Sequence, residues 1–179
     1  TQKLENEQEL SHLTAPLISI SRIINDSLSD LRELSGTLVD NKFQYLGMID
    51  LLKIECTQVN NTGICTAILE GHIAMDIPMQ MKSSLSRICQ EFIQNSLKHA
   101  KAKNIRIQIN DDSEKITLTL HDDGIGFETS SLHGDGMGLH NIRRRTEMMN
   151  GRLEWVSSPG NGTTLHLSIP CIQNIMPIV

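Results

Sequence analysis

Two stripes of apolar residues, with members three or four positions apart, occupy the first 60 residues of the chain. This spacing places the members on one face of a helix, so it predicts two amphipathic helices. The first stripe follows Pro16 and comprises Leu17, Ile20, Ile24, Leu28, Leu31, Leu34 and Leu38. The second follows Asp40, a residue type that caps helices, and comprises Phe43, Leu46, Ile49, Leu52, Cys56 and Val59.

After residue 60 the pattern changes to short strands interspersed with helices, and a domain boundary is expected near residue 61. Residues 1–60 would be the helical part, and residues 61–179 would form a second domain. Strands in hairpins with helices on one side predict an α+β sandwich with a mixed sheet. The expected elements are a strand over 64–69, a helix over 79–100, strands over 104–109 and 115–121 around a turn at 110–113, a helix ending at 150, and strands over 152–157 and 163–169.

Composition narrows the class of protein. Of the 179 residues 39% are hydrophobic but only 3% are aromatic, so the core must consist of Leu, Ile, Val and Met. A net charge of −5 argues against a nucleic-acid partner. Because no apolar run approaches the 18 to 20 or so residues that a membrane span needs, no membrane contact is expected of this chain. The cysteines form no Cys-x-x-Cys pair, which argues against zinc and favours a reducing, cytoplasmic setting; they are Cys56, Cys65, Cys89 and Cys171.

The helix expected over 79–100 carries the first candidate site. Glu91 and Asn95 lie one turn apart on a face away from the apolar stripe, and together they offer two oxygens to a hard cation such as Mg²⁺. Taken alone, the pair is more typical of a solvated helix face. Lys98 and His99 add two side chains that could donate hydrogen bonds to a phosphate. The apolar stripe that should be buried comprises Met81, Leu85, Ile88, Cys89, Phe92 and Ile93.

A second candidate is Asp122-x-Gly124-x-Gly126, directly after an expected strand. A carboxylate there can accept a hydrogen bond from an exocyclic amine, and the glycines allow the backbone to approach a flat ring. A purine with a 6-amino group meets both requirements. The alternative is an ordinary surface turn, because Asp-Gly is common in turns.

Two further glycine motifs follow. Gly134-x-Gly136-x-Gly138-Leu139 opens a helix, and unpaired N–H groups at a helix N-terminus can bind a polyphosphate. Its spacing is superficially that of a dinucleotide fingerprint, but that motif belongs after the first strand of a βαβ unit, and here the loop lies late in the chain. Before the last expected strand, the Thr163 hydroxyl could join Asp122 at the base, directly or through a water molecule.

The order of these four motifs resembles the Bergerat-type ATP-binding fold of the GHKL superfamily, which includes DNA gyrase, Hsp90 chaperones, sensor histidine kinases and MutL. Residues 87–100 resemble the corresponding segment of sensor histidine kinases whose partner regulators carry helix-turn-helix output domains. The short segment between the glycine motifs and the helical sequence over 30–35 resemble the same subclass. The similarity extends over roughly residues 25–170. It implies that residues 1–60 are the C-terminal part of a helical dimerisation and phosphotransfer region with a connecting helix, and that residues 61–179 are the ATP-binding catalytic domain.

This resemblance implies ATP and Mg²⁺ as cofactors. It implies that Asn95 ligates the metal, that Glu91 orders the metal or handles the proton, and that Asp122 binds adenine, while the 134–139 loop closes over the phosphates. Glu91 and Asn95 would thus be the catalytic and metal-binding residues. The ATP-binding residues would be Asn95, Lys98, His99, Asp122, Gly124, Gly126, Gly134, Gly136, Gly138, Leu139 and Thr163.

The implied activity is that of a protein histidine kinase, whose partner is a response regulator and whose full-length parent is a membrane-anchored homodimer. In the subclass the acceptor histidine is followed by an acidic residue, but no His-Asp or His-Glu pair occurs here. His12 precedes Leu13 and is interpreted as a linker residue, so the acceptor is expected upstream of Thr1 in a longer parent. The alternative function is a nucleotide-binding regulatory module of anti-sigma type that acts by gripping a partner protein.

Overall fold

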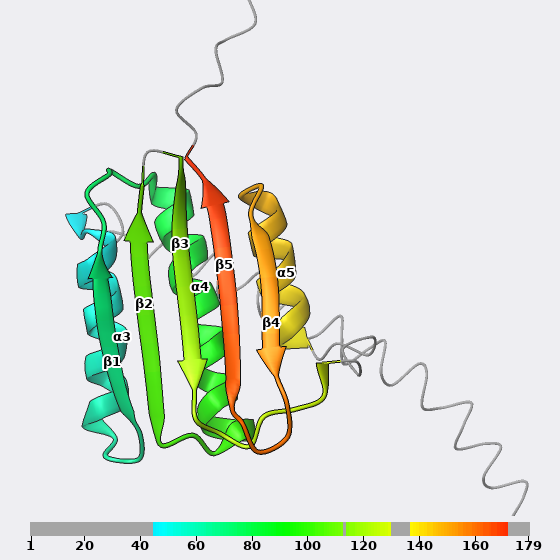
Figure 1. Ribbon diagram of the computed structural model, residues 1–179. Coiled ribbons are helices and arrows are strands. Elements are labelled where there is room, and N and C mark those ends of the chain that lie inside the picture. Colours follow the sequence, from blue (N-terminus) through cyan, green and yellow to red (C-terminus); the bar gives the residue numbers. More distant parts are fainter. Residues whose placement is uncertain (1–44, 113, 130–136, 172–179) are drawn as a thin grey trace, which may run out of the picture. The chain divides into compact units, whose positions relative to one another are not determined.

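The computed structural model describes residues 45–112, 114–129 and 137–171 (Figure 1). These residues belong to one compact unit, Phe43–Val179. The first apolar stripe, His12, and the glycines Gly134 and Gly136 lie outside the described residues, as do residues 1–44 of the helical part expected over 1–60.

A five-stranded mixed sheet forms the centre of this unit, with the strand order β1-β2-β3-β5-β4. β1 and β2 are parallel, and the other neighbouring pairs are antiparallel. The strands are β1 (Thr66–His72), β2 (Asn104–Asp111), β3 (Lys115–Asp122), β4 (Arg152–Ser157) and β5 (Thr163–Pro170). The helices α3 (Met48–Asn61), α4 (Met79–Asn95) and α5 (Met137–Met148) cover one face of the sheet (Figure 1). The predicted α+β sandwich with helices on one face is confirmed.

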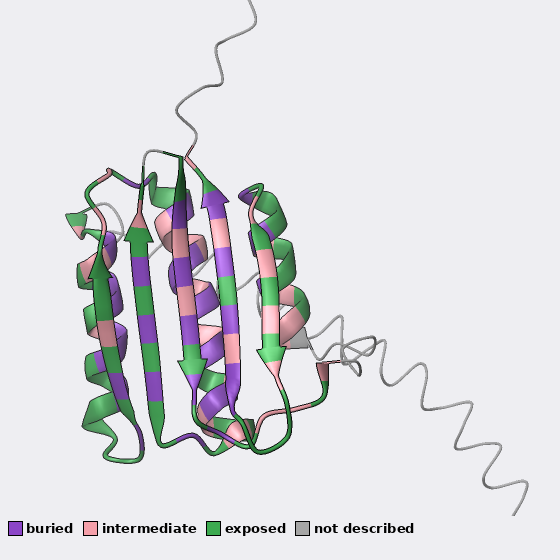
Figure 2. Cartoon of the chain, viewed as in Figure 1, coloured by how far each residue is buried: buried purple, intermediate pink, exposed green. Residues whose placement is uncertain are grey.

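The core lies between this helical layer and one face of the sheet. Along β2, Ile105, Ile107 and Ile109 are buried while Asn104 and Arg106 are exposed, as the two-residue period of a strand requires (Figure 2). The apolar stripe predicted on α4 is buried throughout, from Met81 to Ile93. Since full burial of one such side chain contributes roughly 1.5 to 3 kcal/mol, this shared apolar layer fixes α4 against the sheet. No helix in the described ranges is long and apolar enough to cross a membrane.

The helix α3 packs into the same core. Met48, Leu52, Cys56 and Val59 are buried together with the inward side chains of the strands. The boundary expected near residue 61 falls at the C-terminal end of α3, whereas the compact unit begins at Phe43 and includes the whole of this helix. The described members of the second apolar stripe therefore pack against the face of the sheet that the helices cover.

Two local expectations were wrong in detail. The helix expected over 79–100 is α-helical only to Asn95 and continues as one π-helical turn, η1 (Ser96–Ala100), which Lys101 ends in a left-handed conformation (φ 55°). The turn expected at 110–113 starts later, because β2 extends to Asp111 and pairs there with Ile116. Single π-helical turns within helices are frequent at functional sites, which draws attention to the end of α4.

Candidate functional site

The predicted motifs converge at one end of the sheet. β3 ends there at Asp122, which pairs with Ile105 near the start of β2 and with Thr163 at the start of β5. α4 and η1 end at this side, and α5 starts there (Figure 1). Segments that are far apart in the sequence therefore meet around a single strand end.

Asp122 is the most buried acid at this end, with 2% of the residue exposed. Its Oδ1 accepts a hydrogen bond from the Gly124 backbone N–H at 2.8 Å, and its Oδ2 accepts one from the Ser96 hydroxyl at 2.9 Å. A carboxylate has about four acceptor positions, so two donors leave it with capacity for a donor from a ligand. The sequence argument included Asp122 and Gly124 but assigned no role to Ser96, whose only signal was its position directly after Asn95.

The neighbouring Asp123 is used differently. Its carboxylate accepts hydrogen bonds from the backbone N–H groups of Lys103 and Asn104, each at 2.8 Å, and from the Asn104 side chain at 2.7 Å. The Asn104 side chain is the main cause that holds the pKa of Asp123 below its usual value, with the backbone donors adding to it. Asp123 thus anchors the start of β2, and its carboxylate is already occupied by the chain itself.

The loop after Asp122 is held between η1 and the β4–β5 turn. The Ile125 N–H donates to the Ala100 carbonyl at 2.9 Å, and the Ile125 carbonyl accepts from the Gly160 N–H at 2.6 Å. Gly124 is buried and Gly126 is half-buried in this loop. Beyond them, Phe127 lies edge-on to Trp155, with ring centroids 6.3 Å apart. The loop is therefore shaped by backbone hydrogen bonds on both sides and by an aromatic contact at its end.

Ser157 organises the β4–β5 turn, a role the sequence did not suggest. Its hydroxyl lies 2.8 Å from the Gly162 carbonyl, 3.2 Å from the Thr163 hydroxyl and 2.9 Å from the Phe127 N–H, which donates to it. Thr163 is buried opposite Asp122 in the sheet, but the hydrogen bond that the structure gives its side chain goes to Ser157. Ser157 lies across from Thr163 on the other neighbouring strand, and the expectation that the Thr163 hydroxyl joins Asp122 at the base stays a prediction.

Glu91 and Asn95 lie against the first turn of α5. Both are half-buried on α4. A Cβ placed on Gly138 would collide with Glu91 Oε1 and would lie 3.2 Å from Asn95 Nδ2. Only a glycine permits this approach, which brings three predicted residues from two motifs together. The two side chains offer a carboxylate and an amide oxygen, a donor set that suits Mg²⁺ because this ion takes oxygen ligands and retains several waters.

The remaining predicted residues are more peripheral. Lys98 and His99 are exposed on η1, and Lys98 Nζ lies 3.4 Å from Gln94 Oε1 on the preceding turn. Leu139 is half-buried on α5. Within the described ranges, no three His, Cys, Asp or Glu side chains come together in a way that could hold a metal ion.

Solved structures place this architecture in a known class of domain. The ATP-binding domain of PrrB from Mycobacterium tuberculosis superposes with a TM-score of 0.60 at 17% identity, covering 70% of this chain and 94% of that one. The histidine kinase AdeS from Acinetobacter baumannii gives a TM-score of 0.57 at 14% identity, covering 84% of each chain. At these identities the similarity establishes the fold, which is that of histidine kinase ATP-binding domains.

The family follows from the sequence match. Residues 81–173, just over half of the chain, match the family described as histidine kinase-, DNA gyrase B- and HSP90-like ATPase. The chain belongs to this family. The match begins at residue 81, within α4, so it includes every residue to which the sequence argument gave a role at the site, from Glu91 to Thr163.

Two curated relatives are similar over most of this chain. The signal transduction histidine-protein kinase/phosphatase DegS from Brevibacillus brevis is 26% identical over 170 residues, which is 94% of this chain and 44% of the relative. The sensor histidine kinase ComP from Bacillus subtilis (strain 168) is 29% identical over 156 residues, which is 86% of this chain and 20% of the relative. The chain thus spans less than half of either relative.

Proposed function

We propose that this chain is the ATP-binding catalytic part of a two-component sensor histidine kinase, and that it transfers the γ-phosphoryl group of ATP to a histidine upstream of residue 1 in a longer parent. The observation that carries the proposal is the convergence of a buried carboxylate, Asp122, with the Glu91–Asn95–Gly138 cluster at one end of the sheet. Membership of the ATPase family and the names of the two curated relatives support it.

In this proposal the chain positions the reactants. Asp122 accepts a hydrogen bond from the adenine 6-amino group, and Gly124 and Gly126 allow the backbone to lie against the ring. Asn95 and Glu91 direct oxygens toward Mg²⁺, which when bound neutralises phosphate charge. The N-terminal turn of α5, with Gly138 and Leu139, presents N–H groups to the phosphates. Positioning and charge neutralisation are the main contributions a protein makes to phosphoryl transfer.

The other expected residues keep secondary roles in the proposal. Lys98 and His99, exposed on η1, donate to phosphate oxygens once a nucleotide is bound, and Gly134 and Gly136 belong to the loop that closes over it. The Thr163 hydroxyl, 3.2 Å from the Ser157 hydroxyl, joins Asp122 at the base, directly or through a water molecule. Glu91, half-buried beside Gly138, orders the metal or accepts the proton of the attacking imidazole.

We extend the proposal to the parent protein, as the resemblance to sensor histidine kinases implies. The parent is a homodimer that works with a response regulator, and this part of it is cytoplasmic while the parent is anchored in the membrane. The competing function, a regulatory module that binds nucleotide and grips a partner, would bind ATP without transferring phosphate. Incubation of this chain with radiolabelled ATP and the parent's dimerisation segment separates the two functions, since only the kinase labels a histidine.

Calorimetry with ATP and Mg²⁺ tests the site itself. Asp122→Ala and Asn95→Ala should each lower ATP affinity at least about tenfold, since hydrogen bonds to charged groups are worth roughly 1.5 to 3 kcal/mol. Two neighbours serve as matched controls. Asp123→Asn alters the adjacent acid that the chain already occupies, and Gln94→Ala removes an exposed amide one residue before Asn95. Equal affinity of the wild type, Asp122→Ala and Asn95→Ala would refute the site.

A further inference from the structure

The hydrogen bond between Ser96 and Asp122 joins the two halves of the candidate site. Ser96 is the first residue of η1 and directly follows Asn95, while Asp122 ends β3, 26 residues later. Both residues are nearly inaccessible, with 1% and 2% exposed. A buried polar contact of this kind, between a helix and a strand, holds its two groups in one relative position.

The geometry shows what the Ser96 hydroxyl does for the carboxylate. Its oxygen lies 2.9 Å from Asp122 Oδ2 and 3.0 Å from the Phe92 carbonyl, and its single proton favours the charged acceptor. The Gly124 N–H holds Oδ1 from the other side at 2.8 Å. With one donor on each oxygen, rotation of the carboxylate about its Cβ–Cγ bond is restricted, so its unused lone pairs point in fixed directions.

We propose that Ser96 is a positioning residue for nucleobase recognition: its hydroxyl orients the Asp122 carboxylate so that an unused lone pair faces the 6-amino group of adenine. The inference rests on the proposed function, in which Asp122 binds adenine. Ser96 contributes to affinity only through this carboxylate. Its effect must therefore depend on the ligand having a 6-amino group.

A second serine on the same helix provides a matched control. Ser86 is buried to the same degree as Ser96, with 1% exposed, but among the described residues its hydroxyl has no hydrogen-bond partner. Ser86→Ala and Ser96→Ala thus remove the same atom from similarly buried positions of one continuous helical segment. Only the second change removes a hydrogen bond to Asp122.

The experiment compares two ligands in the full 179-residue chain by calorimetry in the presence of Mg²⁺. One is ATP, and the other is purine riboside triphosphate, which is identical except that it lacks the 6-amino group. Ser96→Ala should weaken ATP binding roughly 5- to 30-fold but weaken binding of the analogue less than about twofold. Ser86→Ala should leave both affinities within about twofold of wild type. Ser96→Thr, which retains the hydroxyl, should restore most of the preference for ATP.

The outcomes separate this inference from the function on which it rests. If Ser96→Ala weakens both ligands equally, or weakens neither, the positioning role is wrong while the proposed function stands. If the wild type binds the two ligands equally well, Asp122 does not recognise a 6-amino group, and the adenine site and this inference are both overturned. Because each comparison is a ratio of affinities within one variant, partial loss of folded protein does not alter the result.

Discussion

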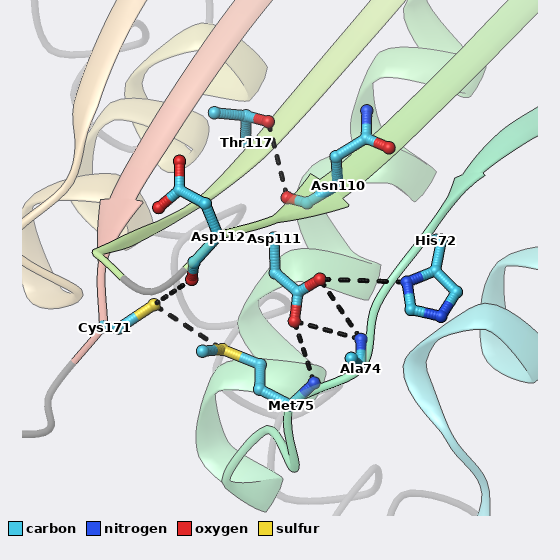
Figure 3. Close-up of polar contacts among 8 residues, drawn as sticks. All are labelled: His72, Ala74, Met75, Asn110, Asp111, Asp112, Thr117 and Cys171. Carbon is cyan, nitrogen blue, oxygen red and sulfur yellow. Dashed lines mark hydrogen bonds and ion pairs between the residues drawn. The ribbon is translucent and has the colours of Figure 1, made fainter.

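Each end of the sheet carries an aspartate at the end of a central strand, but the two carboxylates are used differently. At one end Asp111 terminates β2, and its oxygens accept the backbone N–H groups of Ala74 and Met75 at 2.8 to 3.1 Å (Figure 3). His72 Nδ1 lies 4.0 Å from the same carboxylate. At the other end Asp122 is held by one hydroxyl and one N–H. Asp111 is thus an anchor for the segment that leads from β1 to α4.

The surroundings of Asp111 reinforce this difference. Cys171 Sγ lies 3.6 Å from Met75 Sδ and 3.7 Å from the Asp112 carbonyl (Figure 3). The Cys171 N–H donates to the Glu114 carbonyl at 2.7 Å. Burial is the main cause that raises the pKa of the Cys171 thiol, which favours its neutral form. The residues at this end of the sheet therefore contact one another. An acid whose partners are backbone N–H groups of a connecting segment therefore stabilises the fold. A buried acid with unused acceptor capacity can instead bind a ligand.

The largest effect is expected at Gly162, which couples the fold to the site. Gly162 has φ +67°, and an added Cβ would collide with the Asp122 backbone carbonyl. Gly162→Ala should lower the free energy of unfolding by about 3 kcal/mol or more and abolish ATP binding, as measured by denaturant titration and calorimetry. Gly160→Ala is the control, because it has a similar φ of +83° with open space around its Cβ. Comparable losses in the two variants would mean that backbone strain alone, and not contact with Asp122, explains the effect.

The next effect tests the anchor. Asp111→Asn should lower the free energy of unfolding by about 1 to 3 kcal/mol, because an amide nitrogen would replace one oxygen that accepts backbone N–H groups. ATP affinity should be unchanged, since the site lies at the other end of the sheet. A large loss of ATP affinity in a folded Asp111→Asn protein would remove the distinction between the two ends.

The stability difference between wild type and Asp111→Asn should also depend on pH. The Met75 N–H is the main cause that lowers the pKa of Asp111 below its usual value in the folded chain. The ionised carboxylate therefore stabilises the fold fully above about pH 4, the ordinary pKa of aspartate, and this contribution is lost as the pH falls through the lower folded pKa. The stability difference between wild type and Asp111→Asn should shrink below pH 4. A difference that stays constant down to pH 2 would contradict the assignment.

A smaller effect is expected at Gly138, where only the binding site should respond. Its added Cβ would displace the Glu91 carboxylate, a flexible group, so Gly138→Ala should weaken ATP binding roughly fivefold, or about 1 kcal/mol, and leave the denaturation midpoint nearly unchanged. Gly47→Ala is the control, because its Cβ would make an ordinary contact of 3.6 Å with Asp50. Unaltered ATP affinity in Gly138→Ala would mean that Glu91 takes no part in ATP binding.

The smallest signal is spectroscopic. Trp155 is the chain's single tryptophan, and it packs between Phe92, at 6.4 Å, and Phe127 of the loop after Asp122. Nucleotide bound at Asp122 should shift this loop slightly and change the tryptophan emission, with the same midpoint as in calorimetry. Asp122→Ala should lose the response, whereas Asp111→Asn should keep it. Emission that does not change at saturating ATP would show that Phe127 is insensitive to the ligand.

Periodicity in the sequence predicted most elements of the described unit because burial imposes it directly. Ile105, Ile107 and Ile109 alternate as a half-buried strand must, and the stripe from Met81 to Ile93 recurs as a helical core face must. The π-helical turn at Ser96 was not predicted, because it differs from an α-helix by one hydrogen-bond register and leaves the apolar pattern unchanged. The motifs around Asp122 and Gly138 could be located by their order, but their contacts could not be derived from spacing.

Residue type and local spacing were enough to predict the elements, their inward faces and the glycine motifs of an ATPase family. Which acid anchors a segment of the chain, and which keeps unused acceptor positions, follows only from the tertiary structure. Asp111, Asp122 and Asp123 all lie at strand ends, and their roles differ through donors that strand pairing and helix packing bring from distant segments: Met75 for Asp111, Ser96 for Asp122 and Asn104 for Asp123. Hydrogen bonds act over about 3 Å, so they are set by the packed chain and leave no periodic trace in the sequence.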